Sequence, residues 1–130
     1  MKKREGFSFR DVLIILVFNL AIILAFTAVD YLTHHLNWNL WSVPEYYFKD
    51  KIIFGTFWGI VAYFVLRKWK VSLAVKSFVY SAIIAVLLQI RYALTGYALS
   101  FVILFLFIHF ALLWLVSYLA FKLFRKQLFS

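Results

Sequence analysis

Acidic and histidine side chains gather in the sequence between residues 30 and 50. Asp30 and His34 are four residues apart, so on a helix they share one face, and His35 follows directly. Glu45 and Asp50 come a short distance later in the chain. Imidazole and carboxylate groups together suit Zn, Mn or Fe. A membrane enzyme with an outward-facing metal site is therefore one hypothesis, with Asp30, His34 and His35 as candidate ligands.

Three basic residues favour a different role for the same acids. Lys49, Lys51 and Arg91 fall on the same predicted side of the membrane and can neutralise the carboxylates. We therefore expect no metal, and an ion-pair network in which Asp30 pairs with Arg91 or Lys51. The candidate outer polar cluster has six members: Asp30, His34, His35, Glu45, Asp50 and Arg91.

A second candidate site lies deeper in the predicted helices. Asn19, Thr56, Ser81 and His109 each fall near the middle of a different helix, which predicts four polar side chains near one plane. Such a plane could bind a proton, an ion or the polar head of a ligand. The alternative, which we favour, is hydrogen bonding between helices, at about 0.6–2 kcal/mol per contact. A small transporter that uses Asn19, His109 and Asp30 remains an alternative function.

The amino-acid composition indicates which class of protein contains these two candidate sites. The chain has 130 residues, of which 66% are hydrophobic and 15% charged, and its formal net charge is +9. A soluble domain of this size could not bury so much apolar surface, and a disordered chain would not contain it. An integral membrane protein is indicated, and a soluble nucleic-acid-binding protein is not. The chain has no Cys, which excludes disulfides and thiolate metal sites.

Charge-free apolar stretches define four predicted helices, at about 9–33, 43–67, 71–92 and 97–123. The predicted fold is a single all-α domain, an integral membrane four-helix transmembrane bundle. Capping boxes at Ser8–Asp11 and Ser42–Glu45 predict where the first and second helices start. The third helix must take in Lys76, which we expect to extend its amine to the membrane interface.

The distribution of basic residues predicts the orientation. Of the 14 Lys and Arg residues, 11 fall on one predicted side and 3 on the other. Both termini are therefore expected in the cytoplasm, in a protein of the plasma membrane. The candidate inner-leaflet basic group attracts anionic lipid as well as setting topology, and comprises Arg67, Lys68, Lys70, Lys122, Arg125 and Lys126.

Aromatic residues concentrate on the opposite side, at Trp38, Trp41, Tyr46, Tyr47 and on the later helices at Tyr92 and Tyr97. Trp and Tyr commonly form a belt at the level of the lipid headgroups. We assign these residues to that belt. A lid that gates a lipid or hydrophobic substrate is the alternative.

Gly55 and Gly59 form a Gly-x-x-x-Gly pattern, which allows another helix to approach closely. The partner helix could belong to the same bundle or to a second copy. No phosphate loop, Gly-x-Gly-x-x-Gly or Gly-x-Ser-x-Gly occurs in the sequence. The predicted function is a non-enzymatic accessory or lipid-interacting component of an oligomer or larger membrane complex. Its expected partners are membrane lipid and a second copy or another membrane protein, with no nucleic acid and no cofactor.

Overall fold

The computed structural model describes residues 8–129, which are helical apart from short connections. No strand occurs within this range. The elements, in chain order, are α1 (Phe9–His34), the 3-10 helix η1 (His35–Asn37), α2 (Trp38–Trp41), α3 (Tyr47–Leu66), α4 (Leu73–Leu94), α5 (Leu99–Leu123) and α6 (Arg125–Phe129). The fold is therefore all-helical, as the apolar stretches predict.

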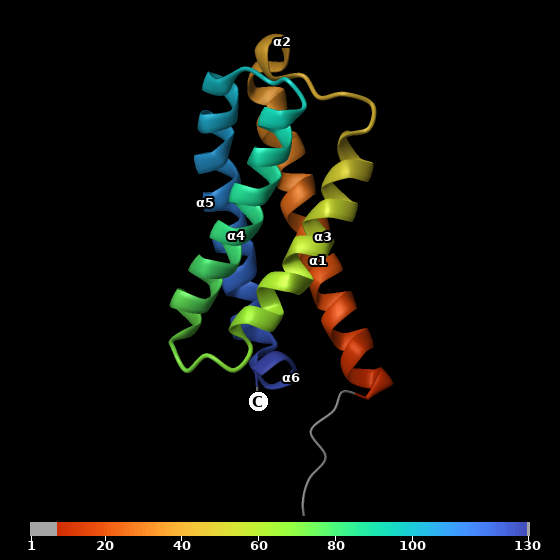
Figure 1. The fold of residues 1–130 in the computed structure, drawn as a ribbon, viewed down its shortest axis with the longest axis vertical. Coiled ribbons are helices and arrows are strands. Elements are labelled where there is room, and N and C mark those ends of the chain that lie inside the picture. Colours follow the sequence, from red (N-terminus) through yellow and green to blue (C-terminus); the bar gives the residue numbers. More distant parts are fainter. Residues whose placement is uncertain (1–7, 130) are drawn as a thin grey trace, which may run out of the picture.

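The long helices lie roughly along one axis (Figure 1). Helix α1 packs against α3 and α5, and α4 packs against the same two helices. The short helix α2 lies at one end of the molecule, and α6 lies at the other end together with the loop between α3 and α4 (Figure 1). We call these the α2 end and the α6 end.

Three segments are long and apolar enough to cross a membrane: Phe9–Trp41, Leu73–Leu94 and Leu99–Leu123. Helix α3 falls outside this group because Lys49, Asp50 and Lys51 all lie near its start. The finding supports a membrane protein.

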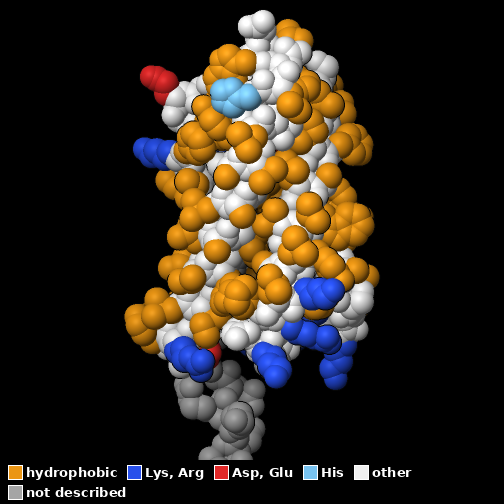
Figure 2. Space-filling view, turned by 180° about the vertical axis from the view of Figure 1, so that it is seen from behind, with side chains coloured by type: hydrophobic (Ala, Val, Ile, Leu, Met, Phe, Trp, Pro, Cys, Tyr) orange, Lys and Arg blue, Asp and Glu red, His pale blue; other side chains and the backbone are white. Residues whose placement is uncertain are grey.

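Polar and apolar side chains are distributed as in a membrane protein rather than a soluble one. Large apolar side chains are exposed on all four long helices, for example Leu24, Phe57, Val86 and Leu115. They cover the middle of the face seen in Figure 2, whereas Lys and Arg gather at its lower end, the α6 end. The buried stripes of the same helices instead contain many polar residues: Asn19, Thr27, Asp30, His34, Lys51, Thr56, Lys76, Ser77, Ser81, Gln89, His109 and Ser117. The surface around the middle of the molecule suits a hydrocarbon environment.

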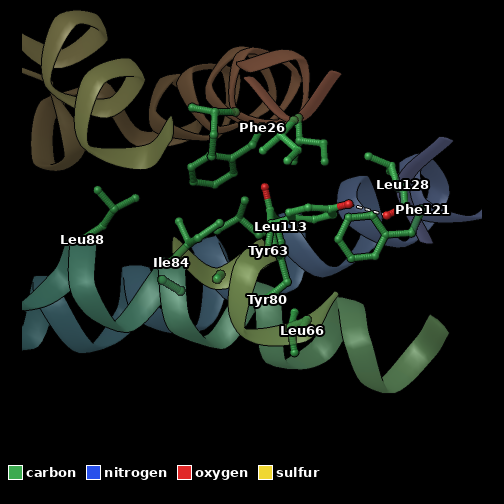
Figure 3. Close-up of a cluster of buried hydrophobic side chains, with 14 residues drawn as sticks. Phe26, Tyr63, Leu66, Tyr80, Ile84, Leu88, Leu113, Phe121 and Leu128 are labelled. Carbon is green, nitrogen blue, oxygen red and sulfur yellow. Dashed lines mark hydrogen bonds between the residues drawn. The ribbon is translucent and has the colours of Figure 1, made fainter. Parts of the chain in front are cut away.

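The apolar core fills the space between the helices toward the α6 end. Phe26, Tyr80, Ile84 and Leu113 come from three helices and are all buried (Figure 3). Helix α6 is fixed to this core because the Tyr63 hydroxyl donates a hydrogen bond to the Leu128 carbonyl (Figure 3).

The two predicted capping boxes have different outcomes. At α1 the box forms, since Asp11 N donates to Ser8 Oγ over 3.2 Å and Ser8 N donates to Asp11 Oδ2 over 3.1 Å. The box predicted at 42–45 is wrong, because α3 begins only at Tyr47 and its N-cap residue makes no side-chain hydrogen bond. The physical reason is Pro44, which disfavours a helical conformation at the preceding residue, Val43.

The Gly-x-x-x-Gly pattern brings α3 close to α1 within the same chain. A Cβ added at Gly55 would lie 3.0 Å from Ile23 Cγ2, and one added at Gly59 would lie 2.8 Å from Asn19 Oδ1. Both glycines are buried. The close approach that these residues permit is therefore already used inside the protein.

Basic residues concentrate at the α6 end. Eight of the eleven Lys and Arg residues in the described range belong to the first turn of α1, the loop between α3 and α4, the start of α4 or the region from Lys122 onward. Lys2, Lys3 and Arg4, which also enter the predicted charge difference, lie outside the described residues.

Candidate functional site

The carboxylate of Asp30, on α1, has no exposed surface and lies among donors from other helices. The Tyr47 hydroxyl donates a hydrogen bond to Asp30 Oδ2 over 2.6 Å. The Lys51 ammonium lies 3.4 Å from the same oxygen. Tyr47 and Lys51 are four residues apart on α3, so both reach α1 from one helical face. Burial of a carboxylate is tolerated here because a buried positive charge lies beside it.

Two histidines complete the group. His34 Nε2 lies 3.2 Å from Asp30 Oδ2, and His109 Nε2, from α5, lies 3.1 Å from Asp30 Oδ1. We call Asp30, His34, Tyr47, Lys51 and His109 the Asp30 cluster. These side chains join α1, α3 and α5, and Lys51 extends the group to α4 by donating a hydrogen bond to the Tyr92 hydroxyl over 2.8 Å.

Aromatic rings hold both imidazoles in place. Phe105 stacks on His34 with ring centroids 4.4 Å apart and planes within 10°. Phe26 contacts His109 edge-on, with centroids 5.3 Å apart. Phe105 and His109 are four residues apart on α5, so one helical face supplies both a ring and an imidazole. The apolar rings keep bulk water from the imidazoles, which strengthens their electrostatic interaction with Asp30.

The hydrogen bonding of His34 determines where its proton lies. His34 Nδ1 is 2.7 Å from the Trp41 carbonyl oxygen, which can only accept, so Nδ1 carries a proton. In a neutral His34, Nε2 then carries a lone pair 3.2 Å from Asp30 Oδ2, although this nitrogen is not aligned with the oxygen for a hydrogen bond. A proton added to Nε2 would make the contact attractive, because an imidazolium and a carboxylate carry opposite charges.

His109 has more freedom. Neither of its ring nitrogens has an aligned hydrogen-bond partner in the described part of the chain, although Nε2 is close to Asp30. Asp30 Oδ1 and His34 Nε2 likewise lack an aligned partner there. Several sites for a proton therefore lie within a few ångströms of one carboxylate, and the cluster can hold different numbers of protons.

A metal ion is the other species that such ligands accept. Asp30, His34 and His109 offer atoms that lie within 4.8 Å of one another. The third ligand is thus His109 and not His35, the residue suggested by the sequence. The Lys51 ammonium beside Asp30 already balances its charge, so a divalent ion would leave excess positive charge in a buried site. The arrangement fits protons better than a divalent metal.

A small cavity separates the cluster from the surface at the α2 end. Its volume is about 20 Å³, enough for roughly one water molecule. Burial and the neighbouring Tyr46 raise the pKa of Tyr97, one of its lining residues, to about 12, so this phenol keeps its proton at neutral pH. The cavity is lined by His34, Ser42, Val43, Pro44, Tyr46, Tyr47, Asp50, Lys51, Tyr92, Tyr97, Phe101 and His109.

The predicted outer polar cluster divides into separate parts. His35 is exposed and stacks on Trp38, with ring centroids 4.4 Å apart. Glu45 is also exposed and outside the group. Asp50 and Arg91 form their own ion pair, with Nε 3.0 Å from Oδ2 and Nη2 3.3 Å from Oδ1. Of the two predicted partners of Asp30, Lys51 forms the pair and Arg91 does not.

The predicted mid-membrane plane is also not one site. Asn19 Oδ1 accepts a hydrogen bond from the Tyr80 hydroxyl over 2.6 Å, and its amide donates to the Ile15 carbonyl over 2.7 Å. Ser81 pairs with Ser117 at 3.1 Å. Buried Thr56 Oγ1 has no hydrogen-bond partner in the described range.

His109 instead joins Asp30, since its Nε2 lies 3.1 Å from Asp30 Oδ1. Asp30 is four residues from the end of α1, and His109 is ten residues into α5. Their contact therefore depends on how α1 and α5 pack, which the lengths of the apolar stretches do not give.

Sequence reasoning missed Tyr47 and Tyr92 as parts of the site and placed them in an aromatic belt. The signal for Tyr47 is its spacing: Tyr47, Lys51, Gly55 and Gly59 recur at intervals of four residues and form one buried stripe of α3.

No protein-family model matches the chain, and neither a curated protein nor a solved structure gives a significant match. The function must therefore be inferred from the Asp30 cluster and its surroundings.

Proposed function

We propose that the protein is a small transporter that carries protons across the membrane, taking them up and releasing them at the Asp30 cluster. The observation that carries the proposal is the 3.2 Å contact between His34 Nε2 and Asp30 Oδ2, with His34 Nδ1 already donating to the Trp41 carbonyl. A proton on Nε2 would turn this contact into a buried ion pair. Ionisable groups inside a membrane commonly mark the path of a proton or ion.

The same proposal gives the protein a topology. Helices α1, α3, α4 and α5 form a four-helix transmembrane bundle in the plasma membrane, with both termini and the α6 end in the cytoplasm. The excess of Lys and Arg at the α6 end supports this orientation. Helix α3 packs between α1 and α4, and its buried Lys51 is paired with Asp30, which supports α3 as a fourth span.

The cavity supplies the route for protons from the outer side. Its lining joins His34, Lys51 and His109 to the exposed loop residues Ser42 and Tyr46. Asn19 has no part in this route, because its side chain is bound to Tyr80 and Ile15. The transporter therefore uses Asp30, His34 and His109 rather than the predicted set of Asn19, Asp30 and His109.

The other two functions have less support. An accessory role in an oligomer was expected to use Gly55 and Gly59, but both glycines contact helices of the same chain. A metal enzyme would have to accommodate the Lys51 ammonium beside its only carboxylate ligand.

The test is proton flux into liposomes that contain the purified protein and an internal pH dye. A potassium diffusion potential, negative inside, drives protons inward. We expect the wild type to give more flux than empty liposomes. The flux should be lost in Asp30→Asn and reduced in His109→Phe. The Phe side chain keeps an aromatic ring at this buried position. Glu45→Gln is the matched control, because Glu45 is exposed at the same end of the molecule and lies outside both the cluster and the cavity lining.

Two results would contradict the proposal: wild-type flux equal to that of empty liposomes, or equal flux in Asp30→Asn and wild type. Circular dichroism of each variant in the same liposomes establishes that it is folded. If Asp30→Asn does not fold, His109→Phe decides the question.

A further inference from the structure

The α6 end contains a hollow that the proposed proton pathway does not use. Its volume is about 540 Å³. It is lined by Arg67, Lys68, Trp69, Lys70 and Val71 of the loop between α3 and α4, by Lys76 of α4 and by Phe129 of α6. Four of these residues are basic, and none is acidic.

Lys76 is the least expected member of the group. The sequence predicts that its amine extends to the membrane interface, but the side chain is buried, with 7% of its surface exposed. Its Nζ lies 4.1 Å from the centroid of the Phe129 ring. Within residues 8–129, no carboxylate lies in ion-pair range of this amine. A buried ammonium without a carboxylate needs a compensating anion or strong cation–π contacts.

The chain itself holds the hollow in shape. Phe129 packs against Tyr63 and Phe121, with ring centroids 5.7 and 4.9 Å apart. Tyr63 also fixes Leu128 through its hydroxyl (Figure 3). The floor of the hollow is thus fixed to the apolar core, while Trp69 on its rim is about half exposed.

These features match the headgroup of an anionic lipid. Each Lys or Arg near an anionic membrane surface contributes about 1 kcal/mol of attraction. Trp favours the headgroup level, where its ring meets lipid and its N–H meets water. The location of the hollow also agrees, because its lining residues lie at the α6 end. On the face seen in Figure 2, apolar side chains give way to Lys and Arg at that end.

We propose that this hollow binds the phosphate of an anionic phospholipid from the membrane leaflet at the α6 end, with Lys76 as its innermost contact. The loop bases Lys68 and Lys70 close over the headgroup, and Trp69 contacts the glycerol region. The occupant is a single lipid held at a defined place, which distinguishes this site from the general attraction of basic residues to an acidic surface. The proposal is independent of proton transport.

Native mass spectrometry of the detergent-solubilised protein tests it, with phosphatidylglycerol and phosphatidylcholine as probes. We expect one phosphatidylglycerol to bind in preference to phosphatidylcholine. Lys76→Met should weaken that binding by about fivefold or more. Lys122→Gln is the matched control, since it removes one exposed charge near the same end without touching the hollow. The pair Lys68→Gln and Lys70→Gln gives a second test that leaves the buried position intact.

Three results would overturn the proposal. The first is equal binding of the two lipids by the wild type. The second is equal weakening in Lys76→Met and Lys122→Gln, which would mean general electrostatic attraction. The third is full competition by inorganic phosphate or glycerol phosphate at the concentration of the lipid, which would identify a soluble anion as the ligand. Should Lys76→Met fail to fold, unchanged lipid preference in the double loop variant would contradict the proposal equally.

Discussion

At the α2 end the buried ammonium of Lys51 lies 3.4 Å from the Asp30 carboxylate, whereas at the α6 end the buried ammonium of Lys76 lies over the Phe129 ring. The first charge is compensated within the chain, and the second lacks a carboxylate in the described range. A buried charge with an internal partner can take part in internal proton exchange. A buried charge without one favours an anion from outside the protein. The two ends are therefore suited to different ligands, a proton and a lipid phosphate.

The largest loss of stability is expected when the buried pair of Asp30 and Lys51 is broken. Asp30→Asn or Lys51→Met alone should lower the free energy of unfolding by about 3–5 kcal/mol, because each leaves one buried partner uncompensated. The double variant should recover most of that loss. Unfolding in detergent, followed by circular dichroism, measures all three. Failure of the double variant to recover stability would mean that the two charges do not compensate each other.

A substitution at Gly59, where α3 packs closely against α1 between the two ends, should destabilise the protein nearly as much. In Gly59→Ala the new Cβ would lie 2.8 Å from Asn19 Oδ1 and 2.9 Å from Tyr80 Oη, so the hydrogen bond between these groups must shift. We expect a loss of about 1–3 kcal/mol in unfolding free energy. The oligomeric state, measured by light scattering on the same sample, should not change. A change of oligomer without loss of stability would place Gly59 in a contact between chains.

A smaller effect is expected at the ion pair nearest the cluster. Asp50 and Arg91 are partly exposed, so Asp50→Asn should cost no more than about 1 kcal/mol. The same unfolding assay gives this value. A cost as large as that of Asp30→Asn would remove the distinction between the buried cluster and its surroundings.

The smallest change in unfolding free energy is expected for exposed residues at the α6 end. Replacing Lys68 and Lys70 with Gln should change the unfolding free energy in lipid-free detergent by less than about 0.5 kcal/mol, because both side chains are exposed. Added phosphatidylglycerol should then stabilise the wild type more than the variant. Equal stabilisation would contradict a role for these residues in lipid binding.

The difference between the two buried lysines, Lys51 and Lys76, can be predicted only in part from the sequence. Helical spacing places Asp30 and His34 together, and charge favours Lys51 as a partner of Asp30. The sequence does not predict that His109 meets Asp30, because the relative height of α1 and α5 follows from their packing and not from helix boundaries, although the predicted end of the first helix at residue 33 is close to His34. Nor does it predict the burial of Lys76, because that depends on Phe129 of α6, whose position follows from tertiary contacts with Tyr63 and Phe121.

Proton transport by the Asp30 cluster depends on a proton shared between His34 and Asp30. Nitrogen-15 NMR of histidine-labelled protein in lipid tests it most directly, because the chain has only 3 His residues and exposed His35 serves as an internal reference. We predict that Nδ1 of His34 is protonated, because it donates to the Trp41 carbonyl, and that Asp30→Asn changes the Nε2 signal of His34 but leaves the signals of His35 unchanged. Identical His34 signals in Asp30→Asn and wild type would contradict a proton shared between these two side chains.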